Sequence, residues 1–201
     1  MNTPLNRTRL PSLILASASP RRSELLRELG EPFVVIKSDA PEVAPDHLSP
    51  AETAQTNAYR KARVIAKQHP DSLVLGADTV VSLGTEVFGK PVDQADAERM
   101  LARLQGRTHL VITGVCLMWL RPYRQRLFAV STAVTFRRLH AGQIRRYLAR
   151  IHPFDKAGGY AIQNDGDLIV KSVKGSYSNV VGLPVEQLRI ELERWRTRSA
   201  D

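Results

Sequence analysis

Residues 73–81 of the chain read LVLGADTVV, a nearly continuous apolar run that is broken by the carboxylate of Asp78. A short apolar run of this kind is typical of a buried strand. An ionised side chain within such a strand is costly unless it is paired, hydrogen-bonded or bound to a cation. We therefore expect a buried strand here, and basic or metallic partners for Asp78.

Strands and helices alternate on both sides of this run. Before it, we expect a strand at 13–16, a helix at 21–29, a strand at 33–36, a loop at 37–48 and a helix from 50 to about 69. Ser49, Pro50 and Glu52 form the capping-box pattern of a helix start. After the run, we expect a helix between Asp93 and Gly106, a hairpin of strands 110–120 and 126–136, a helix at 143–151, a strand at 168–170, a loop at 175–179 and a last helix from Pro184. This order predicts a mixed-sheet α/β domain.

Length and composition favour one domain. With 201 residues, of which 43% are hydrophobic, we expect a single domain over 13–201 with two lobes, preceded by a loose extension at 1–12. No apolar stretch is long enough for a signal peptide or a membrane helix. The single cysteine, Cys116, cannot form an intramolecular disulfide, which fits a reducing, cytoplasmic setting.

The formal charge of +9 raises the question of a nucleic-acid partner. Most of the excess lies in residues 121–150, which contain eight arginines and no Asp or Glu. We expect these arginines to form one patch. Such a patch could bind nucleic acid, attract anionic ligands to a nearby cleft or be a solvated face, which is the commonest case.

The stretch Ser17–Arg22 has the features of a phosphate site. Arginines in the first turn of a helix have the wrong sign for its positive end, by about 0.3 kcal/mol or more, and a bound anion would remove that penalty. Ser17 and Ser19 offer hydroxyls, while Arg21 and Arg22 offer forked donors that suit phosphate oxygens. The alternative is that Ser19 only caps the helix and both arginines are solvated. The stretch is not a P-loop, because the Gly-rich run and the Gly-Lys-Ser/Thr ending are absent.

Two lysines are candidate partners of Asp78. Lys61 shares a helix face with small and apolar residues, and Lys90 lies in a Gly-Lys-Pro turn. A lysine on such a face is expected to reach a carboxylate or a phosphate. The alternative is a purely structural Asp–Lys pair.

A divalent cation would need a second carboxylate, and the loop at 37–48 offers Asp39 and Glu42. We favour Glu42. Two carboxylates together with phosphate oxygens and water are the usual ligands of Mg²⁺ in phosphoryl-transfer sites. The alternative is that both are solvated loop acids. The five histidines show no zinc-ligand spacing.

Four stretches resemble the Maf family in their order and spacing. They are Leu15–Arg22, Gly76–Val81, Gly89–Pro91 and the segment from Gly175 to Pro184. The resemblance implies a fold like that of inosine-triphosphate pyrophosphatase, which is an elongated mixed α/β structure with a cleft between two lobes, usually dimeric. It also implies metal-dependent cleavage between the α and β phosphates of a nucleoside triphosphate, releasing a monophosphate and pyrophosphate.

Three positions that differ between subgroups of the family are Arg21, Thr79 and Gln163 in this chain. They resemble the subgroup that acts on dTTP and UTP, as does the string 155–163. The subgroup that acts on 7-methyl-GTP has a bulky aromatic residue, Gln and Glu at these positions. One departure is that Pro41 precedes Glu42, where the family usually has an Asp-Glu pair.

The resemblance leads to a mechanistic hypothesis. Glu42 and Asp78 hold Mg²⁺ or Mn²⁺, Asp78 accepts the proton of the attacking water, and Lys61 and Lys90 offset negative charge. The phosphate chain is expected on four residues, Ser17, Ser19, Arg21 and Arg22. Gln163 offers the donor and acceptor needed for a uracil or thymine edge. The competing hypothesis is a cell-division or nucleic-acid-binding regulator that uses residues 121–150, which we favour less.

Overall fold

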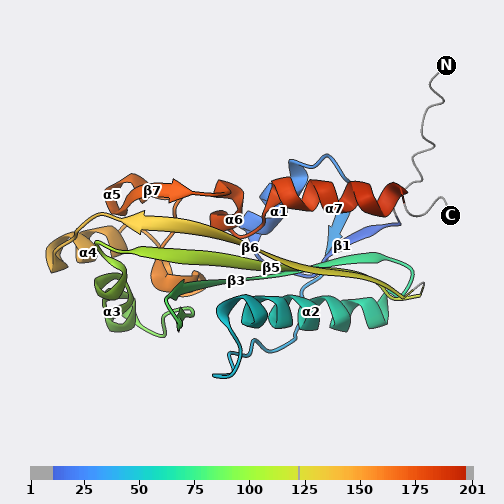
Figure 1. Ribbon diagram of the computed structural model, residues 1–201, viewed down its shortest axis with the longest axis horizontal. Helices are drawn as coiled ribbons and strands as arrows, with labels where there is room; N and C mark the ends of the chain where they lie inside the picture. The colour runs from blue at the N-terminus through green and yellow to red at the C-terminus, as the bar shows by residue number, and fades with distance from the viewer. Residues whose placement is uncertain (1–10, 122, 198–201) are drawn as a thin grey trace, which may run out of the picture.

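The computed structural model describes residues 11–121 and 123–197, so residues 1–10 of the expected extension lie outside the described part. One mixed sheet forms the centre of an elongated molecule (Figure 1). Its strands are β1 (Leu13–Leu15), β2 (Phe33–Val35), β3 (Leu73–Leu83), β4 (Glu86–Phe88), β5 (Thr108–Trp119), β6 (Arg124–Phe136) and β7 (Val170–Lys174). They lie in the order β2-β1-β3-β5-β6-β7, and β4 pairs with β3. Strands β2, β1 and β3 run parallel to one another, and all other pairs are antiparallel.

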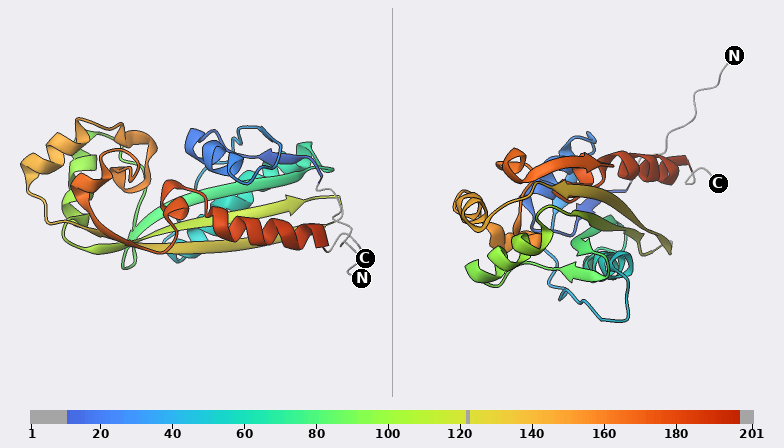
Figure 2. Two further views of the ribbon diagram at one scale, coloured as in Figure 1. Left: turned by 90° about the horizontal axis from the view of Figure 1, so that it is seen from above. Right: turned by 60° about the vertical axis from the view of Figure 1, so that its left-hand side comes forward.

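Helices cover both faces of this sheet. They are α1 (Pro20–Arg27), α2 (Pro50–Gln68), α3 (Gln94–Leu104), α4 (Ala141–Leu148), α5 (Gly166–Ile169), α6 (Tyr177–Val181) and α7 (Val185–Thr197). Helix α2 lies under one face of the sheet, while α1 and α7 pack on the other face. Helices α3, α4 and α5 gather at the far end of the long axis and enclose a second core, which gives the molecule two lobes (Figure 2).

Several sequence expectations are confirmed. The expected helix after the loop is α2, and Ser49 and Glu52 form its capping box. Asp93 caps α3 through a bond from the Asp96 N–H. The hairpin is present as β5 and β6, which are paired from Thr108↔Thr135 to Trp119↔Arg124. Each of these elements carries its own local signal, either a cap or a long alternating strand pair.

Three expectations near the end of the chain and around β4 were wrong or incomplete. Leu168 and Ile169 lie in α5, so the strand expected at 168–170 begins only at Val170. The expected loop 175–179 becomes helical from Tyr177. Strand β4 was not expected. A short apolar run does not separate helix from strand by itself, and here burial of Ile169 in the second core decides the outcome.

Alternating side chains of β3 face the two helical layers. Val74 packs on α2, whereas Leu75 and Ala77 pack on the side of α1 and α7. Two glycines let α2 approach the sheet closely. A Cβ atom at Gly76 would lie 2.2 Å from the Ala58 carbonyl oxygen, and one at Gly114 would lie 2.3 Å from the Ala54 carbonyl carbon. Because Gly114 pairs with Asp78 across the sheet, one of these close approaches lies beside that carboxylate.

One edge of β3 is open in the middle. Strand β1 pairs with residues 73–75 and β4 pairs with residues 81–83, so no described strand covers this edge between them. Asp78 and Thr79 occupy this gap and point to opposite faces of the sheet. Both side chains can therefore reach the space at the open edge, which is where the two lobes meet.

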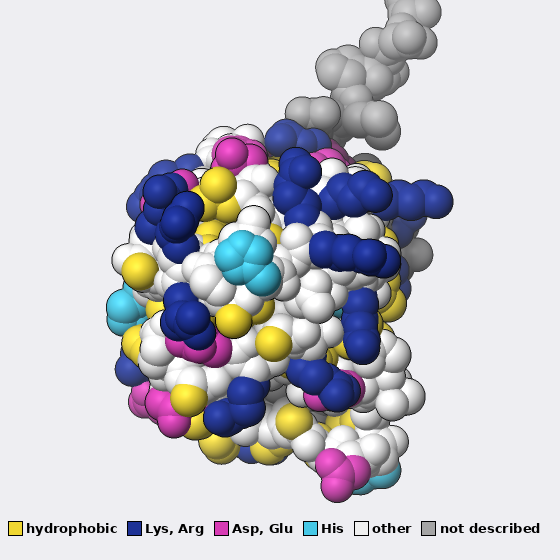
Figure 3. Space-filling model, turned by 90° about the vertical axis from the view of Figure 1, so that its left-hand side faces the viewer, with side chains coloured by type: hydrophobic (Ala, Val, Ile, Leu, Met, Phe, Trp, Pro, Cys, Tyr) yellow, Lys and Arg dark blue, Asp and Glu magenta, His cyan; other side chains and the backbone are white. Residues whose placement is uncertain are grey.

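The arginines of residues 121–150 do not form the single patch that we expected. Strand β6 separates them, and its 13 residues span roughly 40 Å. At one end, Arg121 pairs with Asp71 and Arg126 pairs with Glu191. At the other end, Arg145 lies 4.0 Å from Glu98 and Arg150 pairs with Asp165, while Figure 3 shows further Lys and Arg side chains at the upper right of this face with no acidic side chains among them. Arginines that are close in the sequence are thus separated in space by the length of β6.

Candidate active site

A cavity of about 1040 Å³ lies at the open edge of β3. Its walls come from the turn after β1, the loop 37–48, α2, the loop after β4, the segment 154–163 and the end of α6. The ten residues that the sequence analysis favoured for the site all line this one cavity. They are Ser17, Ser19, Arg21, Arg22, Glu42, Lys61, Asp78, Thr79, Lys90 and Gln163. Asp39, the other candidate acid, is not among the lining residues.

A lysine joins the two carboxylates of the cavity. The Nζ atom of Lys61 lies 2.6 Å from Asp78 Oδ1 and 2.7 Å from Glu42 Oε1. Asp78 and Lys61 are buried, whereas the Glu42 side chain is half-exposed. The sequence placed Glu42 and Asp78 in separate segments, and the fold brings both within reach of one ammonium group. A cation can therefore contact both carboxylates at this point.

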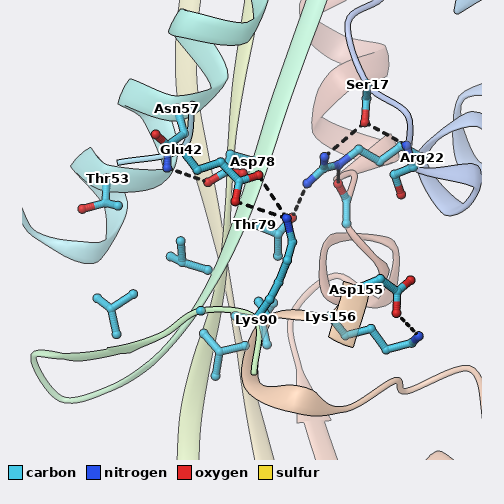
Figure 4. Close-up of a pocket in the computed structure, with 18 of the residues that line it drawn as sticks. Ser17, Arg22, Glu42, Thr53, Asn57, Asp78, Thr79, Lys90, Asp155 and Lys156 are labelled. Carbon is cyan, nitrogen blue, oxygen red and sulfur yellow. Dashed lines mark hydrogen bonds and ion pairs between the residues drawn. The ribbon is translucent and has the colours of Figure 1, made fainter. Parts of the chain in front are cut away.

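Lys90 completes this charged cluster from the opposite wall, as Figure 4 shows. It lies 3.2 Å from each carboxylate oxygen of Glu42, so its partner is Glu42 rather than Asp78. Partial burial raises the pKa of Glu42, but the hydrogen bonds and charges of Lys61 and Lys90 outweigh it and lower that pKa to about 2. Glu42 is consequently a carboxylate throughout the neutral range.

A second group of donors lies across the cavity from Glu42 and Asp78 (Figure 4). The guanidinium of Arg22 donates to Gly182 O at 2.9 Å, to Ser17 Oγ at 3.3 Å and to Thr79 Oγ1 at 3.1 Å. Burial lowers the pKa of Arg22, against the opposing effect of the Asp78 and Glu42 charges. No carboxylate contacts this guanidinium among the described residues, so its positive charge is available to an anion in the cavity.

The hydroxyl of Thr79 is fully committed within the protein. Thr113 Oγ1 donates its hydrogen to the Asn179 carbonyl, so in the 2.9 Å contact between the two threonines Thr79 is the donor. Thr79 Oγ1 then accepts from Arg22. Thr79 therefore orients Arg22 rather than offering a free hydrogen to the cavity.

The start of α1 follows neither of the two expectations for Ser19 completely. Ser19 occupies the N-cap position, but its side chain makes no capping hydrogen bond. Ser17 accepts hydrogen bonds from the Ser19 N–H and from Arg22. The Ser19 hydroxyl is thus left available at the cavity wall, beside the free N–H groups of the first turn.

The far end of the cavity holds the remaining expected residues. Arg21 donates from Nη1 to Asp155 Oδ2 at 2.9 Å and from Nη2 to the Asp155 carbonyl at 3.2 Å. Lys156 donates to the same carboxylate (Figure 4), and the two cations outweigh partial burial and lower the pKa of Asp155 to about 2. Gln163 is exposed on the same segment. The pairing of Arg21 with Asp155 spans 134 residues and left no local signal in the sequence.

Comparison with known proteins assigns the chain to a family. The pattern of the family described as "Maf-like protein" matches residues 12–195. The chain belongs to the Maf family. Similar proteins named "dTTP/UTP pyrophosphatase" come from Symbiobacterium thermophilum, at 47% identity over 89% of this chain and 91% of that protein, and from Moorella thermoacetica, at 48% over 89% and 92%.

A solved structure also resembles this Maf protein. It is titled "Structure of a HAM1 protein from Coxiella burnetii", with a TM-score of 0.51 and 16% identity, and the match covers 92% of this chain and 100% of that one. At this identity, the likeness concerns the fold alone, and it agrees with the elongated mixed sheet that the sequence resemblance implied. Among the described residues, no helix is long and apolar enough to cross a membrane.

The carboxylates of this Maf protein fit a divalent cation that takes its remaining ligands from a substrate and water. Within the described part of the chain, no three His, Cys, Asp or Glu side chains cluster into a metal site. Glu42 and Asp78 offer two carboxylates around the position that the Lys61 ammonium occupies. Two carboxylates with phosphate oxygens and water suit Mg²⁺ or Mn²⁺.

One residue of the site was missed in the sequence. Asn57 lies one turn before Lys61 on α2 and donates to Asp78 Oδ2 at 3.0 Å. The sequence offered one indication, since Asn57 and Lys61 are polar residues four positions apart on a face of small and apolar side chains.

Proposed function

We propose that this Maf protein uses a divalent cation to hydrolyse dTTP and UTP between the α and β phosphates. The products are a nucleoside monophosphate and pyrophosphate. The observation that carries the proposal is the division of one cavity into an acidic side and a basic side. The Glu42–Asp78 pair lies opposite Arg22 and Ser17, which is the arrangement needed to hold a cation against a phosphate chain. The names of the relatives support the nucleotide class.

The residues would divide the work as follows. Arg22, Ser17 and Ser19 bind phosphate oxygens, and the free N–H groups at the start of α1 assist them. A divalent cation on Glu42 and Asp78 would neutralise phosphate charge and favour ionisation of water. Asp78 accepts the proton of the attacking water, and its bonds to Lys61 and Asn57 hold its carboxylate in place. Lys61 and Lys90 offset the charge of the carboxylates and the leaving pyrophosphate.

We assign the base to the end of the cavity that carries Arg21 and Gln163. The exposed Gln163 amide has a donor and an acceptor, which matches the O4 and N3–H groups of uracil and thymine. The pairing of Arg21 with Asp155 commits its guanidinium within the protein, which supports this end as a base site rather than a second phosphate site. A nucleotide with 7-methylguanine, which is larger and positively charged, is the alternative substrate.

We further propose that residues 13–201 act as one domain, in the cytoplasm and as a homodimer. The fully buried Cys116, with no second cysteine, suits a reducing compartment. Val34 and Val35 are exposed on the edge strand β2, which supports pairing with a second copy. Sedimentation of the purified protein tests the dimer, and a monomeric mass at micromolar concentration contradicts it.

A substrate screen tests the activity. The purified protein is incubated with dTTP, UTP, other canonical triphosphates, modified pyrimidine triphosphates and 7-methyl-GTP, each with Mg²⁺, Mn²⁺ or a chelator. We expect pyrophosphate and a pyrimidine monophosphate as products, with no turnover under chelation. Preference for 7-methyl-GTP overturns the assignment of the base, and release of orthophosphate alone overturns the assignment of the bond.

A further inference from the structure

The side-chain amide of Asn57 connects three parts of the site. It lies on α2 and is 3% exposed. Its Oδ1 atom accepts a hydrogen bond from the Val43 N–H at 2.9 Å, and its Nδ2 atom donates to the Val43 carbonyl at 3.0 Å and to Asp78 Oδ2 at 3.0 Å. One side chain thus contacts the loop that carries Glu42 and the strand that carries Asp78 (Figure 4).

The chemistry of these partners determines the orientation of the amide. An ionised Asp78 and the Val43 carbonyl can only accept, so both need the NH₂ group, whereas the Val43 N–H needs the oxygen. A flipped amide would place its oxygen against two acceptors. Both N–H bonds of Asn57 are used, and a leucine of similar size could make none of the three contacts.

The loop 37–48 depends on this contact for its position. Within the described part of the chain, the two bonds between Asn57 and Val43 are the only hydrogen bonds that tie the backbone of this loop to another segment. The other backbone bonds of the loop are internal, from Ala40 to Ser38 and from Leu48 to Pro45. Glu42 directly precedes the anchored residue, so the backbone of the second carboxylate is held at this point.

We propose that Asn57 is a positioning residue that sets the distance between Glu42 and Asp78, and thereby the affinity of this pair for a divalent cation. The inference rests on the proposed function for the role of the pair, but the anchoring of the loop is a property of the protein alone. Ion pairs with Lys61 and Lys90 also hold the Glu42 side chain, but an ammonium group lacks a fixed donor plane and tolerates a range of carboxylate positions. The amide of Asn57, in contrast, fixes the main chain.

The test compares the wild type with Asn57→Leu and with Ala66→Gly. Ala66 is buried on the same helix more than two turns away and does not line the cavity, so Ala66→Gly controls for loss of helix stability. Three quantities are measured, namely hydrogen exchange of the Val43 amide, binding of Mn²⁺ by magnetic resonance without nucleotide, and the Mn²⁺ concentration that half-activates dTTP hydrolysis. If Asn57→Leu does not fold, Asn57→Ser takes its place.

For Asn57→Leu, we expect Val43 exchange and the Mn²⁺ dissociation constant each to rise by about tenfold or more, which is the range found for outer partners of metal ligands. The half-activating concentration should rise in parallel, and Ala66→Gly should change none of the three. Unchanged Val43 exchange, or unchanged Mn²⁺ affinity in a folded variant, overturns the inference. If the wild type neither binds Mn²⁺ nor hydrolyses triphosphates, the proposed function fails, and Val43 exchange then decides the anchoring by itself.

Discussion

Lys61 on α2 and Asp78 on β3 form a buried ion pair of 2.6 Å at the open edge of the sheet. Without a carboxylate at position 78, the site loses both a proposed cation ligand and the proposed proton acceptor. We expect Asp78→Asn to reduce kcat for dTTP by at least about 100-fold, which is the scale of general-base catalysis. The variant should still fold, because Lys61 keeps its ion pair with Glu42. Steady-state kinetics with saturating Mg²⁺ and circular dichroism measure both effects. Turnover at the wild-type rate rules out the proposed mechanism.

The three hydrogen bonds of Arg22 require a guanidinium. Lysine keeps the charge but cannot reach Gly182, Ser17 and Thr79 together. We expect Arg22→Lys to raise KM for dTTP by about tenfold or more and to lower the free energy of unfolding by about 1–3 kcal/mol, because partly buried acceptors lose their donor. Arg27→Lys, at an exposed position on the same helix, is the matched control. An unchanged KM excludes Arg22 from phosphate binding.

Gly114 allows the close contact between α2 and the strand beside Asp78. An added Cβ would lie 2.3 Å from Ala54 backbone, which cannot yield without moving the helix. We expect Gly114→Ala to lower the free energy of unfolding by at least about 2 kcal/mol, as overpacking does, and to reduce kcat by displacing Lys61. Gly89→Ala has open space around its Cβ and serves as the stability control in urea denaturation. Equal stability of the two variants contradicts the close contact.

The buried histidine of the second lobe makes stability depend on pH. Burial lowers the pKa of His109 from 6.5 to about 4, and its Nε2 atom lies 2.8 Å from the Tyr160 hydroxyl. The unfolded chain therefore binds a proton at a higher pH than the folded protein does. The resulting stability is complete above pH 6.5 and is lost as the pH falls toward 4, by up to about 3 kcal/mol. Thermal unfolding should show a smaller loss for His109→Gln over this interval. Identical pH profiles exclude His109 as the cause.

The division of the arginines between the ends of β6 bears on nucleic acid. Because Arg121, Arg126 and Arg150 pair with acidic side chains, fewer positive charges remain to contact phosphates along one face. We expect no binding of single- or double-stranded DNA or RNA as tight as about 1 µM at physiological salt, which is the tight end of the range for non-specific binding. Filter binding across a salt series measures this. Micromolar affinity with a steep salt dependence supports the regulatory hypothesis instead.

Local sequence signals were sufficient for the elements with strong caps or long alternation. The capping box of Ser49 and Glu52 and the hairpin of β5 and β6 needed no tertiary information. Leu168 and Ile169 did need it, because an apolar run as short as 168–170 suits a helix or a strand equally. For the site, the apolar surroundings of Asp78 indicated a partner but not which one, and only the structure separated Lys61 from Lys90. Glu42 was already favoured over Asp39 from the sequence, and it is Glu42 that lines the cavity.

The sequence by itself determined the chemical types of the site and the family. These depend on residue identity and spacing, as in the serines and arginines of the turn 17–22 and the carboxylate within strand 73–81. Tertiary structure decided which groups meet. Arg21 and Asp155 are 134 positions apart, and Asn57 reaches Val43 and Asp78 only because glycines 76 and 114 let α2 lie close to the sheet. Contacts of this kind depend on packing between distant segments, for which a single sequence carries no local pattern.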